Sequence, residues 1–194
     1  MSVRDGLLAI LTLGPAYGLQ LHSELASRAP HRGPVNVGQI YSTLERLTGQ
    51  GLIESAGQTS DGLPLHRLTD AGVMAVDTWK SDAALDALPE WTEMLDQVLI
   101  ATTLDPVSAM RLVESYRRWW TLDRDGTRAS LTAEHLRTDA RLALLARETQ
   151  AVAALAWLGA ASDALADFDT HRPYSPDKPK RGRRPRPAPK ARAR

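Results

Sequence analysis

The stretch from residue 36 to residue 72 constrains the fold more than any other part of this 194-residue chain. Within it, residues 37–47 carry apolar side chains at steps of three and four, the spacing of an amphipathic helix. Two short runs, 52–55 and 65–68, flank an Asp-Gly turn signal and predict a two-stranded ribbon. A further helix is expected from Thr69. Because two more helices are expected before this stretch, the order predicts a winged helix-turn-helix.

The same helical spacing predicts long helices in the second half of the chain. Outside the stretch above, we expect helices at residues 3–13, 19 to about 30, 91–103, 105 to about 134, and about 138–168. A helix of about 30 residues is about 45 Å long, which is more than one small domain needs. Long helices with an apolar stripe usually pack on a partner, so we expect a second copy of the chain to cover the last helix.

Charge is distributed unevenly along the chain. Residues 171–194 hold ten of the 24 Lys and Arg and one of the 23 Asp and Glu, which leaves 14 basic and 22 acidic residues in 1–170. The net charge of +1 therefore combines a tail of about +9 with a body of about −8. From Pro173 onward, prolines and basic residues exclude a packed core, so we expect the tail to be disordered.

These patterns predict a mainly α fold in three parts. A winged helix-turn-helix with a two-stranded β wing is expected in 1–82, a helical dimerisation and effector domain in 83–170, and a disordered Pro-, Arg- and Lys-rich tail in 171–194. The chain has no cysteine, which excludes disulfides and thiolate metal sites. The apolar run at 7–13 is too short to span a membrane. We therefore expect a cytoplasmic protein without a membrane partner, and association with the nucleoid only if the chain binds DNA.

The helix expected at 37–50 has a polar face suited to reading bases. At 100° per residue its buried side holds Val37, Ile40, Leu44 and Leu47, and Asn36 is expected to cap it. The opposite face holds Gly38, Gln39, Ser42, Arg46 and Gln50, with Thr43 and Glu45 on the flanks. Gln pairs with adenine, Ser and Thr are versatile, and Arg prefers guanine or phosphate. The alternative is an ordinary surface helix of a winged-helix fold used for protein contacts.

Three sequence blocks resemble the PadR family of bacterial transcriptional regulators. They are residues 14–21 (GPAYGLQL), 37–47 (VGQIYSTLERL) followed by 51–53 (GLI), and 67–72 (RLTDAG). The last expected helix, with Ala156-Trp157-Leu158, is similar to the family's dimerising helix. The resemblance covers roughly residues 3–168, is most specific in the first 80, and does not extend to the tail. The chain departs from many members in having Leu65-His66 where they have an aromatic pair.

The resemblance implies a homodimer that binds a palindromic operator in double-stranded DNA, usually as a repressor released by a small-molecule ligand. The recognition-helix tyrosine and its polar neighbours would then face the DNA. The candidate DNA-binding residues are Tyr17, Asn36, Gly38, Gln39, Tyr41, Ser42, Thr43, Arg46, His66 and Arg67. Some members hold flat aromatic ligands between tryptophans at the dimer interface, which makes Trp91 and Trp157 candidates for a ligand site or for the dimer core. Tryptophans at helical spacing are more often packing residues.

The first 72 residues attract a polyanion only weakly, because they contain five basic and six acidic residues. Phosphate neutralisation supplies most non-specific DNA affinity. We hypothesise that the tail supplies it through Lys180, Arg181, Arg183, Arg184 and Arg186, which resemble an AT-hook interrupted by the extra Arg184. Arginine is drawn to the negative potential of narrow minor grooves. The alternative is a solvated tail that adds solubility, or one that binds the acidic body and hinders DNA binding.

Signatures of catalysis and of metal binding are missing from the sequence. It contains no P-loop, Gly-x-Ser-x-Gly or dinucleotide fingerprint, and its five histidines lack metal-ligand spacing. We therefore expect neither an enzyme nor a cofactor. Two hypotheses remain: a ligand-responsive dimeric repressor, or a winged-helix protein-interaction or nucleoid-associated module that binds DNA non-specifically through its basic tail. A repressor should prefer its operator over random duplex by about 10³ or more.

Overall fold

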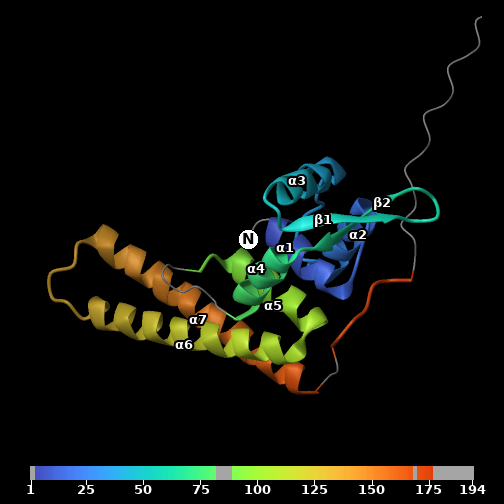
Figure 1. Ribbon diagram of the computed structural model, residues 1–194. Helices are drawn as coiled ribbons and strands as arrows, with labels where there is room; N and C mark the ends of the chain where they lie inside the picture. Colours follow the sequence, from blue (N-terminus) through green and yellow to red (C-terminus); the bar gives the residue numbers. More distant parts are fainter. Residues whose placement is uncertain (1–2, 82–88, 168–169, 177–194) are drawn as a thin grey trace, which may run out of the picture.

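The computed structural model describes residues 3–81, 89–167 and 170–176 (Figure 1). The elements run in the order α1 (Val3–Ile10), the 3-10 turn η1 (Leu11–Leu13), α2 (Gly18–Arg28), α3 (Val37–Gly49), β1 (Ile53–Gln58), β2 (Pro64–Leu68), α4 (Asp70–Ser81), α5 (Trp91–Leu104), α6 (Pro106–Leu131) and α7 (Thr138–Asp167). This is the mainly α fold with a two-stranded wing that the sequence predicts. In the described part of the chain, no helix combines the length and the apolar composition needed to cross a membrane.

Side-chain caps decide where several of these helices begin. The Oδ1 atom of Asn36 accepts a hydrogen bond from the main-chain N–H of Gly38 at 2.8 Å and opens α3. Asp105 opens α6 in the same way, accepting from the N–H of Val107 at 3.1 Å. The hydroxyl of Thr69 accepts from a main-chain N–H in the first turn of α4 at 3.1 Å. The predicted caps of α3 and α4 are therefore confirmed, as is the start of α6 after Asp105.

The wing is an antiparallel pair that is joined to the turn before α2. Strand β1 pairs with β2, with Ile53 opposite Leu68, and the register shifts between Ser55 and Gln58. Ala16 extends the ribbon on the other side of β2, because its N–H and C=O exchange hydrogen bonds with His66 at 3.0 and 2.9 Å. The wing is therefore fixed to the helix-turn-helix by main-chain hydrogen bonds as well as by side chains.

Helix α5 contributes to both of the larger hydrophobic cores of the described chain. Its C-terminal residues Ile100 and Leu104 pack with α1 to α4 in the core of the winged helix. Its N-terminal half adds Met94 and Val98 to the core formed with α6 and α7. Between them, the buried amide of Gln97 accepts from the Tyr116 hydroxyl of α6 and donates to a carbonyl of α4. The domain boundary expected at residue 82 falls outside the described residues, and α5 carries packing across it.

Helices α6 and α7 form a long antiparallel pair that extends away from the winged helix (Figure 1). Arg128 on α6 donates to the carboxylate of Glu148 on α7 at 2.6 Å, and a second ion pair joins Arg147 to Asp123. Part of the apolar stripe of α7 is uncovered within the described chain: Leu142 is 61% exposed, Leu145 41% and Val152 46%. This exposed stripe lies on the helix that the sequence expects to pack on a second copy.

The buried face of α3 differs from the predicted face at two positions. Val37, expected in the core, is 37% exposed, whereas Thr43, expected on an exposed flank, is 2% exposed. Helix α1 packs beside α3, and its residues Val3 and Arg4 line the same hollow as Thr43. Val37 occupies the first position of the helix, where fewer neighbours reach it. The remaining predicted core positions, Ile40, Leu44 and Leu47, are buried.

Residues 170–176, which we call the strap, also differ from the prediction. A disordered tail is expected from residue 171, but the strap lies against the protein. The Thr170 hydroxyl donates to a carbonyl of α5 at 2.7 Å, and the main-chain N–H of Arg172 donates to another at 2.9 Å. Tyr174 packs on the core of the winged helix. Figure 1 shows this segment leaving the end of α7 and running toward α2.

Position 72 in α4 has no room for a side chain. A Cβ atom on this residue of α4 would lie 2.0 Å from the carbonyl oxygen of Leu52. Gly72→Ala should therefore lower the free energy of unfolding by about 1–3 kcal/mol, the usual range for overpacking. In α6, Gly126→Ala is the matched control, because a Cβ there meets nothing within 4 Å and alanine favours a helix by about 0.5–1 kcal/mol. Urea denaturation followed by circular dichroism measures both, and equal effects would contradict the close packing.

Candidate nucleic-acid interface

The outer face of α3 is polar and exposed. Gly38, Gln39, Ser42 and Arg46 all lie on it, as the helical spacing predicts. The Ser42 hydroxyl donates to the main-chain carbonyl of Gln39 at 3.1 Å, a bond within the helix that leaves its oxygen lone pairs outward. In Figure 1, α3 lies at the top of the molecule, and no other element lies over its outer side. The face presents hydrogen-bonding groups of the kind that read base edges in a major groove.

Tyr41 reaches from α3 to the start of α2. A Cβ atom on Gly18 would lie 2.7 Å from the Cε1 atom of the Tyr41 ring, so the ring occupies the space that a side chain at position 18 would need. Tyr17 precedes Gly18 as the residue before the first turn of α2 and is half-buried. The structure therefore brings the two candidate tyrosines to one junction between the helices of the helix-turn-helix. Asn36 lies at the other end of the same face, where its side chain caps α3.

The wing contributes little positive charge. On β2, the guanidinium of Arg67 donates to Glu54 Oε1 of β1 at 2.8 and 2.7 Å, and both side chains are exposed. His66 is half-buried, and this burial lowers the pKa of its imidazole, which favours the neutral form at neutral pH. Both candidates lie next to the helix-turn-helix. Arg67 is there a cation paired with Glu54, and the ring of His66 favours its neutral form.

Among the described residues of 1–72, Arg46 is the arginine that is not paired with a carboxylate. Its Nε atom donates to the carbonyl of Ser42 at 3.3 Å and its Nη2 atom to the hydroxyl of Thr43 at 3.1 Å, and the described part of the chain gives it no acidic partner. Thr43 therefore positions Arg46 and, being buried, does not itself face outward. The other arginines of residues 1–72 lie 2.5–2.9 Å from carboxylates, in the pairs Arg4–Asp5, Arg28–Glu24, Arg32–Asp96 and Arg67–Glu54.

The loop before α3 is held by a buried carboxylate of α5. Asp96 accepts from the Nε atom of Arg32 at 2.6 Å and lies 3.0 Å from the Nε2 atom of His31. The hydrogen bond with Asp96 raises the pKa of Arg32, which keeps its guanidinium charged. The sequence reasoning missed this contact. Its one signal is a carboxylate on the buried face of an otherwise apolar helix, because buried charges are almost always paired.

The two candidate tryptophans are brought together. Trp91, at the start of α5, and Trp157 of α7 meet edge to face, with ring centroids 5.9 Å apart and an angle of 65° between their planes. Both are half-buried against the second core. A flat ligand between the rings would have to separate them, so their assignment to a ligand site or to the dimer core stays a prediction. The tail candidates Lys180, Arg181, Arg183, Arg184 and Arg186 lie outside the described residues.

The burial of His66 predicts a pH dependence of stability. An unperturbed histidine has a pKa near 6.5, and burial lowers this pKa in the folded chain. Below about pH 6.5 the unfolded chain therefore binds more protons, so the free energy of unfolding falls as the solution is acidified.

His66→Gln should remove this part of the pH dependence. Urea denaturation at pH 7.5 and 5.5 measures it, with His135→Gln, at an exposed position, as the control that should behave like the unaltered chain. An equal loss of stability on acidification in all three proteins would contradict the role assigned to His66.

Comparison with known proteins found similarity to one protein family and to several solved structures. Residues 7–77 match the model of the transcriptional regulator PadR-like family. Among solved structures, the chain is similar to Bacillus subtilis PadR in complex with operator DNA, at 18% identity over 84% of this chain and 98% of that one, with a TM-score of 0.40. It is also similar to the Vibrio cholerae virulence activator AphA, at 19% identity over 86% of this chain and 97% of that one, with a TM-score of 0.37. No curated protein matches. The matched segment runs from within α1 to within α4, so the winged helix-turn-helix of this chain is the part that is similar to the transcriptional regulator PadR-like family.

Proposed function

We propose that this protein is a sequence-specific DNA-binding transcriptional regulator that reads base edges with α3. The observation that carries the proposal is the exposed polar face of α3. The Asn36 cap, the loop before α3 and strand β1 of the wing hold this helix in place. The family of the winged helix is one of transcriptional regulators, which supports the same function. A helix exposed only to solvent would more often carry Glu and Lys pairs.

The proposed contacts divide by chemistry. Gln39 and Ser42 hydrogen-bond base edges, and Gly38 lets the backbone approach the groove. Arg46, positioned by Thr43, takes a guanine or a phosphate. Tyr17 and Tyr41 contact the flanking backbone, with Asn36 acting through its cap on α3. On the wing, Arg67 reaches phosphate by exchanging its exposed partner Glu54, and such surface ion pairs are weak.

A homodimer would place two such helices on one operator. Recognition helices that enter successive major grooves on one side of DNA lie about 34 Å apart, so the operator would be palindromic. The long pair of α6 and α7, with 26 and 30 residues, can set this spacing. The exposed apolar residues Leu142, Leu145 and Val152 of α7 are the surface that the second copy would cover.

We further infer a repressor that a small molecule releases, acting in the cytoplasm at the nucleoid. The pair Trp91 and Trp157 supports a site for a flat aromatic effector, because it joins α5 to α7. Helix α5 also holds the loop before α3 through Asp96. A ligand that separated the two rings would therefore act on the same helix that positions the recognition helix.

The alternative function is a winged-helix interaction or nucleoid-associated module that binds DNA non-specifically. The observation in its favour is the poor supply of cations: among the arginines of residues 1–72, only Arg46 is without a described carboxylate partner. Specificity separates the two functions, because the alternative binds all duplexes alike.

Gln39→Ala combined with Ser42→Ala tests the proposed reading. The unaltered chain should prefer a duplex from upstream of its own gene over a scrambled duplex by about 10³ or more. The double variant should lose most of this preference, because each lost base contact reduces discrimination by about 1–3 kcal/mol. Gel-shift titrations measure both. Ser130→Ala with Gln150→Ala, the same residue types on α6 and α7, is the control. A double variant that keeps its preference contradicts the reading, and an unaltered chain without preference favours the alternative.

Leu145→Glu tests the role of α7 in dimerisation. A charge in the stripe that we expect a second copy to cover should dissociate the dimer and weaken operator binding at least 10-fold, although Leu145 touches no DNA. Sedimentation measures the oligomeric state and gel shift the affinity. Met74→Glu, at an exposed position of α4, should leave both unchanged. A stable monomer that binds the operator at full affinity would contradict the proposed spacing role.

A further inference from the structure

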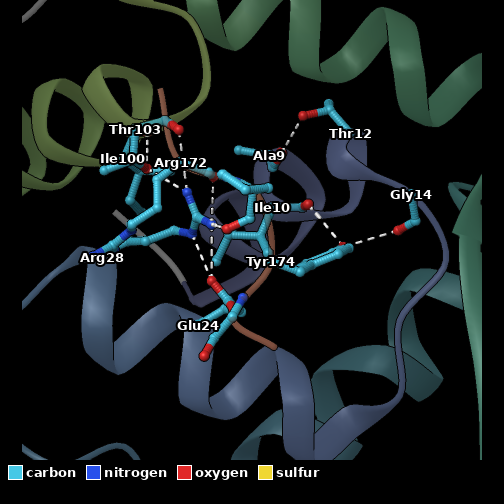
Figure 2. A network of polar contacts seen from close by, with 12 residues as sticks. Ala9, Ile10, Thr12, Gly14, Glu24, Arg28, Ile100, Thr103, Arg172 and Tyr174 are labelled. Carbon is cyan, nitrogen blue, oxygen red and sulfur yellow. Dashed lines mark hydrogen bonds and ion pairs between the residues drawn. The ribbon is translucent and has the colours of Figure 1, made fainter. Parts of the chain in front are cut away.

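The buried arginine of α2 has no hydrogen-bond donor left for a ligand. Figure 2 shows the guanidinium of Arg28, from the last turn of α2, surrounded by oxygen atoms of α2, α5 and the strap. It donates five hydrogen bonds: to Glu24 Oε2 at 2.9 Å, to the carbonyl and hydroxyl of Thr103 at 3.2 and 2.8 Å, and to the carbonyls of Arg172 and Pro173 at 2.9 and 3.0 Å. A guanidinium has five N–H donors. The role of Arg28 is therefore structural.

Three other arginines line one hollow between α1, the loop before α3 and α3 itself. The hollow has a volume of about 390 Å³, whereas a water molecule takes about 30 Å³ in the liquid, so an ion with several hydrogen-bonding partners fits. The rest of the lining in the described chain is amide, hydroxyl or apolar, and none of it is a carboxylate. We call this site the arginine hollow; its polar lining is Arg4, Arg32, Gln39, Thr43, Arg46 and Gln50.

Two of these guanidinium groups have donors that the described chain does not use. Arg46 donates from Nε to the carbonyl of Ser42 and from Nη2 to the hydroxyl of Thr43, which occupies two of its five N–H groups. The described contact of Arg4 is one hydrogen bond, from Nη1 to Asp5 at 2.5 Å, and 41% of its side chain is exposed. Unlike Arg28, both arginines therefore have N–H groups available to a ligand.

The charge around the arginine hollow is positive. Arg4 pairs with Asp5 and Arg32 with Asp96, whereas Arg46 has no carboxylate partner among the described residues. Three guanidinium groups thus accompany two carboxylates, which leaves an excess of one positive charge. The planar fork of a guanidinium matches the oxygens of a phosphate, and hydrogen bonds between charged groups of this kind are among the strongest in proteins. The arginine hollow therefore has the chemistry of an oxyanion site.

We propose that the arginine hollow binds a phosphate group, which Arg4 and Arg46 hold and whose charge Arg32 helps to balance. Arg46 and Gln39 also belong to the outer face of α3, so the hollow lies beside the surface that is proposed to read bases. The backbone of the bound duplex supplies the phosphate, and a small phosphorylated molecule is the other source of the same chemistry. The inference rests on the proposed function only for the duplex as the source.

Titration of the full-length chain with inorganic phosphate tests the site without DNA. Phosphorus NMR measures the line width of phosphate at constant ionic strength, and the unaltered chain should broaden the line saturably. Arg4→Gln and Arg46→Gln should each weaken this binding about 10-fold, because each removes a hydrogen bond between charged groups. Arg117→Gln, at an exposed position of α6, is the control and should change nothing. Circular dichroism checks that each variant is folded.

Binding to a random-sequence duplex of about 30 base pairs identifies the source of the phosphate. The affinity is measured between about 50 and 200 mM salt, and again with inorganic phosphate replacing chloride at constant ionic strength. If the duplex supplies the phosphate, Arg4→Gln should make the slope of log affinity against log salt shallower by about 0.9 for each bound subunit. Phosphate should then also compete with the duplex. An unchanged slope in a variant that no longer binds phosphate would assign the hollow to a small phosphorylated molecule.

Three results would overturn the site. They are the absence of saturable phosphate binding, binding that neither Arg4→Gln nor Arg46→Gln weakens, and binding that Arg117→Gln weakens equally. Phosphate held elsewhere on the chain is the same in all four proteins, so it cannot imitate the expected difference. None of these readouts depends on base preference. A chain that binds the upstream and scrambled duplexes alike would therefore contradict the proposed function and leave the phosphate site intact.

Discussion

The buried guanidinium of Arg28 is the contact on which the arrangement of this molecule depends. It joins α2 of the winged helix to the end of α5 and to the strap that follows α7. Asp96 of α5 makes a second polar link, to the loop before α3. Buried ion pairs are weak evidence for stability, because desolvation offsets their attraction. Their effect here is geometric: the loop before α3, α5 and the strap are held in one defined arrangement.

We propose that this arrangement separates the recognition of bases from the binding of the phosphate backbone. Helix α3 offers a polar face in which Arg46 is the cation not paired with a carboxylate among the described residues. Such a face can discriminate between bases but contributes little sequence-independent affinity. We infer that this affinity comes from duplication through α6 and α7, and the hypothesis drawn from the sequence adds the basic tail. The net charge of +1 conceals this division, because a basic tail and an acidic body cancel.

Periodicity and capping residues predicted most of the fold, because both depend on local sequence. The start of α3 at Asn36, the start of α6 after Asp105 and the two-stranded wing follow from such signals. What depends on distant neighbours was not predictable. Thr43 is buried because α1 lies beside it, and the strap is ordered because Arg28, about 145 residues earlier, needs acceptors for its donors. Composition indicated that residues 173–176 cannot form a core of their own. It gave no sign that Tyr174 would pack on the core of the winged helix.

We propose that α3 of each subunit reads one half of a palindromic site. Selection of bound duplexes from a random-sequence library by the full-length chain tests it without assuming an operator sequence. The account predicts enrichment of an inverted repeat whose half-sites are centred one helical turn, about 10 base pairs, or a multiple of it apart. It also predicts that this enrichment disappears when Gln39 and Ser42 are replaced by alanine. Recovery of duplexes without a common sequence, or of the same repeat with the double variant, would contradict it.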